Sequence, residues 1–142
     1  MNNNNGLPKE IVAAQGGLSF GDYTASEKIK VNDFNHMGNV YNLRAHNLVT
    51  RLEKNGELLF EAVPGVAVYN FNFDEKGCTF EIENPQAAQI TLGLEPEITY
   101  DLAIGDNTGN ELREEITANR SGKVSFGVEL EGLKKKVNLG KL

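Results

Sequence analysis

The sequence predicts an all-β protein, a single antiparallel β-sandwich with about nine or ten strands. From residue 18 onward, apolar and polar residues mostly alternate with a period of two, which is typical of half-buried strands. Turn-forming residues interrupt this alternation roughly every eight to twelve residues, the spacing expected of a sandwich or barrel. The chain has 142 residues, of which 39% are hydrophobic, and this is enough for one buried core.

The composition narrows the functional classes. The formal net charge of −6 argues against a nucleic-acid partner, because nucleic-acid binding requires basic patches. No apolar run is long enough to span a membrane, so no membrane partner is expected. The single cysteine excludes an intramolecular disulfide and a multi-cysteine zinc site. The first residues lack the pattern of a secretory signal, so the chain is expected to be cytoplasmic, or else a module excised from a larger secreted protein.

Residues 1–17 are expected to form a flexible tail, and residues 18–142 a single sandwich domain. A short helical turn is expected within residues 7–16. Pro8 suits the first position of a helix, and residues 10–15 favour helix.

The longest expected strand region is residues 40–54. It follows a strand at 18–23, another at 27–31, and a segment at 32–39 that is rich in Asn, Asp, His and Gly and is expected to be a loop. Alternation places Tyr41, Leu43 and Ala45 on one side of the strand. It places Asn42, Arg44 and His46 on the other side. The alternation then breaks, which predicts a bulge near Asn47.

Asn55 and Gly56 predict a two-residue hairpin turn of type I′, because both residues tolerate the positive φ that this turn needs. The turn would pair Lys54 with Glu57, Glu53 with Leu58, and Leu52 with Leu59. The opposite charges of Lys54 and Glu57 favour that register by roughly a few tenths of a kcal/mol.

Later strands are expected at residues 66–73, 78–83, 90–94, 98–104, 112–118, 124–130 and 133–139. In the strand at 66–73, the face that would form a core stripe carries Ala67, Tyr69, Phe71 and Phe73. The other face would be partly polar and carries Val66, Val68, Asn70 and Asn72. The last strand contains consecutive lysines and is expected at the edge of a sheet.

Residues 94–102, Leu-Glu-Pro-Glu-Ile-Thr-Tyr-Asp-Leu, resemble a corner found in fibronectin type III and related immunoglobulin-like sandwiches. The resemblance implies an Ig-like sandwich, with a jelly-roll-like arrangement as the alternative, in which the Tyr100 hydroxyl bonds to the backbone a few residues upstream. Residues 51–60 and 118–126 look like stretches of short bacterial β-sandwich proteins labelled endosialidase-like. No catalytic residues can be assigned from that resemblance, and the chain is too short for a sialidase propeller.

No catalytic residue, metal site or cofactor is predicted, so the chain is expected not to be an enzyme. His36 and His46 have no recognised metal-ligand spacing. Cys78 lies on the apolar face of its strand and is expected to be a small buried hydrophobe rather than a nucleophile. Residues 106–111 contain oxygen ligands and a glycine, which leaves calcium binding as an alternative to a simple hairpin turn. Glutamates spaced by two on strands are more often solvated than catalytic.

The predicted ligand-binding residues are Tyr41, Asn42, Arg44, His46, Asn70 and Asn72. The chain has 17 asparagines, and most lie in the first residues or at expected turns. Asn42, Asn70 and Asn72 instead lie in the middle of expected strands. Planar amides and the arginine fork can make paired hydrogen bonds to sugar hydroxyls. Sugar recognition also needs an exposed aromatic ring, which Tyr23 or Tyr41 would supply.

These features favour a non-catalytic binding or accessory module whose ligand is a glycan. The alternative is a structural subunit of a homo-oligomer or of a larger sugar-processing enzyme complex. Edge strands at residues 40–48 and at the C-terminus would then pair with a partner. A small hydrolase using Glu81, Glu83 or His46 is a third hypothesis.

Overall fold

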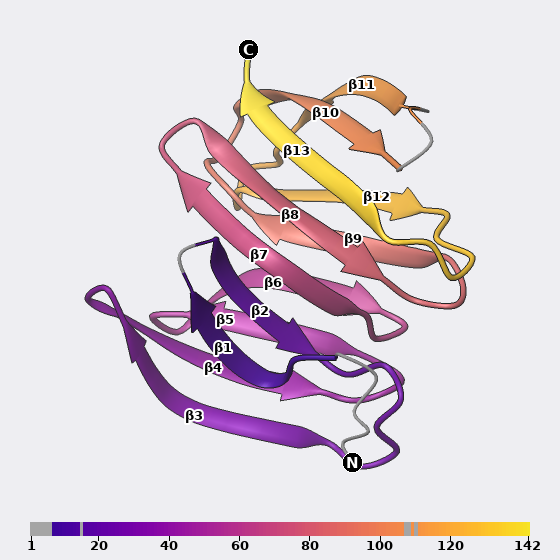
Figure 1. Ribbon diagram of the computed structural model, residues 1–142. Helices are drawn as coiled ribbons and strands as arrows, with labels where there is room; N and C mark the ends of the chain where they lie inside the picture. The colour runs from indigo at the N-terminus through magenta and orange to yellow at the C-terminus, as the bar shows by residue number, and fades with distance from the viewer. Residues whose placement is uncertain (1–6, 15, 107–108, 110) are drawn as a thin grey trace.

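The computed structural model describes residues 7–14, 16–106, 109 and 111–142. Within these ranges the chain forms thirteen strands and no helix, arranged as two antiparallel sheets packed face to face (Figure 1). The predicted all-β class and sandwich architecture are therefore confirmed, with thirteen strands in the described ranges in place of the predicted nine or ten. In the same part of the chain, no helix is long and apolar enough to cross a membrane.

The strands are divided between sheet A and sheet B. Sheet A has seven strands in the order β1 (Lys9–Ala14), β2 (Gly17–Gly21), β7 (Ala67–Asp74), β8 (Gly77–Glu83), β13 (Lys135–Lys141), β10 (Thr99–Gly105) and β11 (Glu111–Thr117). Sheet B has six strands in the order β12 (Lys123–Val128), β9 (Ala88–Gly93), β6 (Glu57–Val63), β5 (Thr50–Lys54), β4 (Asn39–Ala45) and β3 (Ile29–His36). On one side of the sandwich, β1 of sheet A lies against β3 of sheet B.

The N-terminal segment differs from the prediction. Residues 9–14 form β1, which pairs with β2 as a hairpin, so neither the helical turn nor a tail reaching residue 17 is present. Ile11 is buried in the core, and this burial together with strand pairing outweighs the weak local preference for helix. Residues 1–6 of the expected tail lie outside the described part of the chain.

The expected loop at residues 32–39 is mostly strand β3. The polar residues there accommodate a bulge, at which Asp33 has a positive φ of 57° and its N–H donates to Asn42 Oδ1 at 3.0 Å. The chain reverses only at Met37 and Gly38, and both have positive φ. Asn and Asp therefore marked an irregular strand rather than a loop.

The expected long strand at residues 40–54 is divided into β4 and β5. A turn closed by the His46 N–H to Val49 oxygen bond, 2.9 Å long, separates them, so the interrupted alternation marked a chain reversal and not a bulge near Asn47. The next turn is as predicted, with φ of 53° at Asn55 and 85° at Gly56. Lys54 pairs with Glu57 as expected.

One pair in that hairpin departs from the predicted register. Glu53 faces Leu58 as expected, but Leu52 faces Phe60 instead of Leu59, because the register shifts by one residue. This shift allows both Leu59 and Phe60 to be buried.

Strand β7 also contains a bulge, which changes which side chains face the core. Asn70 has a φ of 55°, and the shift lets both Val68 and Phe71 point inward. Tyr69 is therefore not part of the predicted core stripe. It lies on the outer side of sheet A, where its hydroxyl donates to Glu83 at 2.9 Å.

The edges of the sheets are not the predicted ones. Strand β4 lies between β3 and β5, and the lysine-bearing strand β13 lies between β8 and β10. The true edges of the described sheets are β1 and β11 in sheet A and β3 and β12 in sheet B. In β13 the exposed Lys136 and Asn138 alternate with the buried Val137 and Leu139, so Lys136 lies on the solvated face of a central strand.

Phe60 occupies the centre of the core between the sheets. It projects from β6 of sheet B and meets Phe20, Phe71 and Phe80 of sheet A at ring-centroid distances of 5.5, 6.0 and 5.6 Å. All three contacts are edge-to-face, a geometry worth about 0.5–1.5 kcal/mol per pair beyond the burial of area.

The crossover from β9 in sheet B to β10 in sheet A passes through residues 94–98. The N–H of Glu95 donates to the hydroxyl of Tyr100 at 3.2 Å. This is the side chain to backbone bond expected from the pattern in residues 94–102, and it ties the start of β10 to the end of β9.

Asp22, directly after β2, is a buried carboxylate with several partners. It accepts hydrogen bonds from the N–H of Thr24 at 2.9 Å and from the Thr24 hydroxyl, and it pairs with Lys9 Nζ at 3.1 Å. Burial alone would raise the pKa of Asp22, but the bonds from Thr24 and Lys9 outweigh burial and hold the pKa below its ordinary value of 3.8.

Replacing Phe60 with alanine should lower the free energy of unfolding by about 3–5 kcal/mol, because it removes the ring of sheet B that packs on the phenylalanines of sheet A. Urea denaturation followed by circular dichroism measures the loss. Val63→Ala is the matched control, since Val63 lies on the same strand with 52% of its surface exposed and should cost about 0.5 kcal/mol or less. Equal losses in both variants would contradict the central role of Phe60.

Replacing Asp22 with asparagine should destabilise the protein by about 1–3 kcal/mol near neutral pH. The folded-state pKa lies below the unfolded value of 3.8, so the stabilisation by Asp22 is present above that value and is lost as the pH falls through the folded pKa. Unfolding curves from about pH 7 to about pH 2 should therefore converge for the two proteins at acidic pH. A constant difference across this range would show that the charge of Asp22 does not matter.

Candidate functional site

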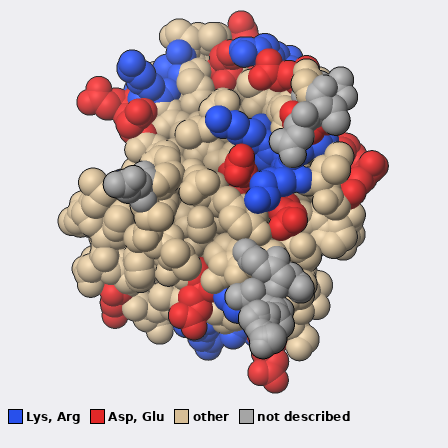
Figure 2. All heavy atoms as spheres, viewed as in Figure 1, with Lys and Arg blue, Asp and Glu red and all other residues tan. Residues whose placement is uncertain are grey.

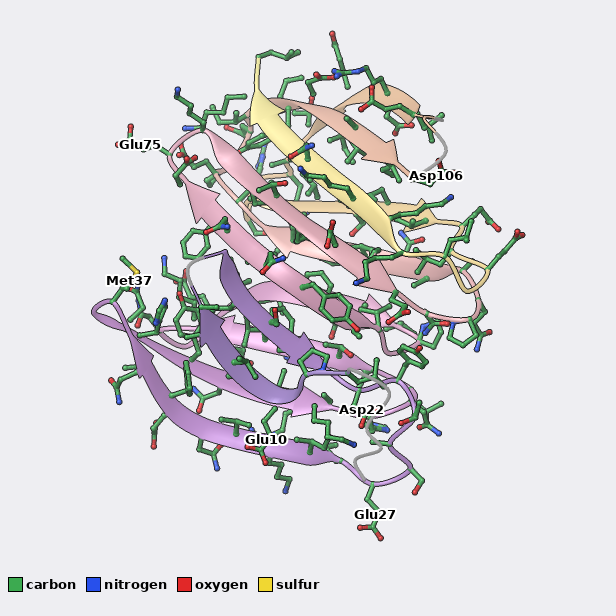
Figure 3. The ribbon with its side chains drawn as sticks, in the orientation of Figure 1. Glu10, Asp22, Glu27, Met37, Glu75 and Asp106 are labelled. Atoms are coloured by element: carbon green, nitrogen blue, oxygen red, sulfur yellow. The ribbon has the colours of Figure 1, made fainter. Side chains whose placement is uncertain are left out.

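One end of the sandwich contains a cavity of about 350 Å³ between the two sheets. Figure 1 shows that the β3–β4, β5–β6 and β7–β8 turns lie at this end, and in Figure 3 Met37 and Glu75 mark it, whereas Asp106 lies at the opposite end. The cavity floor is apolar and comes from both sheets: Leu59, Phe71, Cys78, Leu94 and Tyr100. The rim is charged and carries Lys54, Asp74, Glu75 and Glu95.

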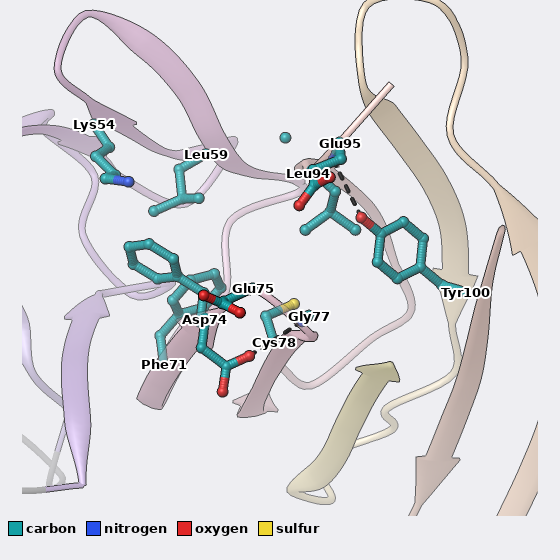
Figure 4. Close-up of a pocket in the computed structure, with 12 residues that line it drawn as sticks. Lys54, Leu59, Phe71, Asp74, Glu75, Gly77, Cys78, Leu94, Glu95 and Tyr100 are labelled. Atoms are coloured by element: carbon teal, nitrogen blue, oxygen red, sulfur yellow. Dashed lines mark hydrogen bonds between the residues drawn. The ribbon is translucent and has the colours of Figure 1, made fainter. Parts of the chain in front are cut away.

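The close-up in Figure 4 shows how the two sheets form the walls. Lys54 and Leu59 lie on one side, and Glu95 and Tyr100 lie on the other. The position of the wall from sheet A depends on Gly77, where a Cβ atom would approach the Leu139 oxygen to 1.8 Å. No other residue would let β8 and β13 approach so closely at this point.

The charges on the rim are only partly neutralised. Lys141 Nζ pairs with Glu95 Oε2 at 2.6 Å, and Lys54 Nζ lies 4.5 Å from the ring centroid of Phe73. Asp74 Oδ1 accepts the N–H of Lys76 at 2.8 Å, which closes the β7–β8 turn. The carboxylates of this rim can accept hydrogen bonds, and the Lys54 ammonium can donate them.

A second hollow of about 230 Å³ adjoins the first. Both hollows are lined by Phe71 and Phe73, so the half-buried Phe73 is shared between them. The remaining lining comes from the β1–β2 hairpin, the β3–β4 turn and β7, and includes His36, Met37, Asn39, Tyr41 and Asn72. We call the two hollows together the end groove.

The structure separates most of the residues predicted to bind ligand. Asn42 and Arg44 lie in sheet B, where the Asn42 side chain holds the β3 bulge and Arg44 Nη1 donates to the Leu43 oxygen at 2.8 Å. His46 follows β4 at the other end of that strand and contacts Asn47, 3.3 Å from Nδ1. Asn70 lies in sheet A, at the β7 bulge. These residues therefore do not form one face.

Tyr41 and Asn72 are the members of the predicted set that line the smaller hollow together. Tyr41 is buried rather than an exposed platform, and its burial raises the pKa of its hydroxyl, against an opposing hydrogen bond with Asn39. The amide of Asn72 donates to the oxygen of Gly16 in the β1–β2 hairpin. On the side of the molecule drawn in Figure 2, few charged side chains lie over β1, β2 and β7.

Sequence reasoning missed Lys54, Phe73, Asp74 and Glu95 as a group. Lys54 and Asp74 directly precede turns, and Phe73 comes just before Asp74. Glu95 lies in the crossover between the sheets. The only available signal was this shared position, because the ends of antiparallel hairpins from two packed sheets can meet at one end of a sandwich.

The candidate metal residues do not converge. His36 and His46 lie at opposite ends of the β3–β4 hairpin, and no three His, Cys, Asp or Glu side chains in the described ranges are placed to hold a metal ion. The predicted alternative of calcium binding at residues 106–111 falls partly outside the described residues.

Comparison of the chain with protein-family models, with curated proteins and with solved structures finds no match.

Cys78 should resist alkylation in the folded protein. Burial, with a smaller effect of the Asp74 charge, raises the pKa of its thiol to about 12, so the reactive thiolate is scarce near pH 8. Mass spectrometry after iodoacetamide treatment should find little modification until denaturant is added. Ser125→Cys supplies an exposed cysteine as an internal control, and comparable rates at both positions would contradict the prediction.

Proposed function

We propose that this protein is a non-catalytic binding or accessory module whose end groove holds a neutral saccharide. The observation that carries this proposal is the pair of adjoining hollows that share Phe73, with an apolar floor and a rim of hydrogen-bonding groups. A cavity of about 350 Å³ lies within the usual range for small-ligand sites, which is roughly 300–1,000 Å³.

The chemistry of the groove matches the two sides of a sugar ring. The C–H groups of a pyranose are apolar and would lie on the floor and against the ring of Phe73. The hydroxyl groups would face the rim, where Asp74 and Glu75 can accept hydrogen bonds and Lys54 can donate them. Such charge-assisted bonds are stronger than neutral ones and would fix the orientation of the ligand.

The charge of the rim favours a neutral saccharide over an acidic one. Glu95 is already paired with Lys141, which leaves Lys54 facing both Asp74 and Glu75. An acidic sugar would meet two carboxylates and a single ammonium group, and like charges at short range disfavour binding.

Replacing Lys54 with methionine or Asp74 with asparagine should weaken saccharide binding by about tenfold, because each change removes one charge-assisted hydrogen bond. Titration calorimetry with neutral hexose and N-acetylhexosamine oligomers, compared with sialylated oligomers, measures this change. Methionine has an unbranched apolar side chain like the stem of Lys54 and can still pack beside Phe73, so the fold should be retained.

Lys30→Met is the matched control, since Lys30 is an exposed lysine of β3 and does not line the groove. Binding of neutral sugars that is lost in the Lys54 and Asp74 variants but kept in the control supports the proposal. Failure of every neutral sugar to bind, or an equal loss in the Lys30 variant, would overturn it.

A further inference from the structure

Three of the four sheet edges carry features that discourage pairing with another chain. Strand β3 is bent by the bulge at Asp33, and β1 begins with a bulge between Lys9 and Ile11 and lies beside β3. Strand β11 places Glu114 on the same side as the partly buried Ile116, so an added strand would enclose a charge. Bulges and inward charges are the usual protections of sheet edges.

Strand β12 lacks these protections within the described structure. It pairs regularly with β9 over its whole length, without a bulge, and its single charged residue is Lys123 at the start. Its inward side chains are the buried Val124, Phe126 and Val128. Its outward residues include the small and exposed Ser125 and Gly127, so its free edge is flat and open to a second strand.

The core is also incompletely covered beside this strand. A cavity of about 310 Å³ lies between the end of β12 and the β10–β11 hairpin, where Ile104 and Val128 contribute apolar surface. Leu112 borders the same cavity and is 60% exposed. Apolar side chains exposed next to an unprotected edge favour an associated state over the isolated chain.

We propose that two copies of this chain associate through antiparallel pairing of β12 with β12, which joins their B sheets into one continuous sheet. The pairing is centred on Phe126, so that Ser125 faces Gly127 of the second copy and Val124 faces its Val128. Inward residues of one copy then lie beside inward residues of the other, as the two-residue period of strands requires.

The charges at the ends of β12 select this register. Pairing centred on Phe126 places Lys123 opposite Glu129 of the second copy, and it does so twice because the dimer is symmetric. Glu129 is exposed and forms no ion pair with any described residue. One other register also keeps inward residues beside inward residues and pairs five residues of each strand. It is centred on Ser125 and places Lys123 opposite Gly127, so it gains no such contact.

The oligomeric state of the whole chain tests this proposal by light scattering coupled to size exclusion, over a range from about 1 to about 200 μM. We expect a dimer, about twice the 15.6 kDa of one chain. Glu129→Lys should raise the dissociation constant about tenfold or more, since two attractive contacts become repulsive. The double variant Lys123→Glu with Glu129→Lys should restore the dimer, because it exchanges the charges and keeps them complementary.

Glu114→Lys on β11 is the matched control. It makes the same change of charge on an edge strand of sheet A, outside the proposed interface. Weakening by Glu129→Lys, rescue by the charge exchange and no effect of Glu114→Lys would support the β12 interface. A monomer across the concentration range, a dimer unaffected by Glu129→Lys, or failure of the charge exchange to rescue would each overturn it. A chain that remains monomeric but binds strand-forming peptides at this edge would likewise overturn it.

Discussion

The packing of three phenylalanine rings from sheet A around Phe60 of sheet B is the contact on which the rest of the structure depends. Two sheets with polar outer faces are stable only if their inner faces stay together, and this cluster lies where they meet. Phe71 belongs both to this cluster and to the end groove. The floor of the candidate site is thus an extension of the core and has the rigidity of the core.

The sequence predicted the fold class because alternation of apolar and polar residues is a local signal, and most of the strands follow it. The errors occurred where the backbone changes that alternation. At Asn70 a positive φ inserts one residue into β7, so Tyr69 turns outward while Val68 and Phe71 both remain inside. Which Asn accommodates a bulge and which forms a turn depends on the strands on either side. A single sequence does not contain that information in readable form.

The candidate site was less predictable than the fold for a related reason. The predicted residues were chosen because they share a face within one strand, but the end groove is built across strands that are distant in the chain. Lys54 and Glu95 line opposite sides of one cavity only because the two sheets pack with these segments at the same end. Tyr41 and Asn72 of the predicted set line the same hollow, yet they come from different sheets. Sequence spacing cannot place such residues together, because sheet packing decides their separation.

The central position of β13 has a consequence for the order in which the chain can fold during synthesis. Strands β8 and β10 have no direct pairing, and β13 alone joins the β1–β2–β7–β8 half of sheet A to the β10–β11 hairpin. A nascent chain can therefore assemble sheet B, whose strands all precede β13, before it can complete sheet A. Until β13 leaves the ribosome, the facing edges of β8 and β10 have no strand to pair with, and such unpaired edges are exposed to aggregation.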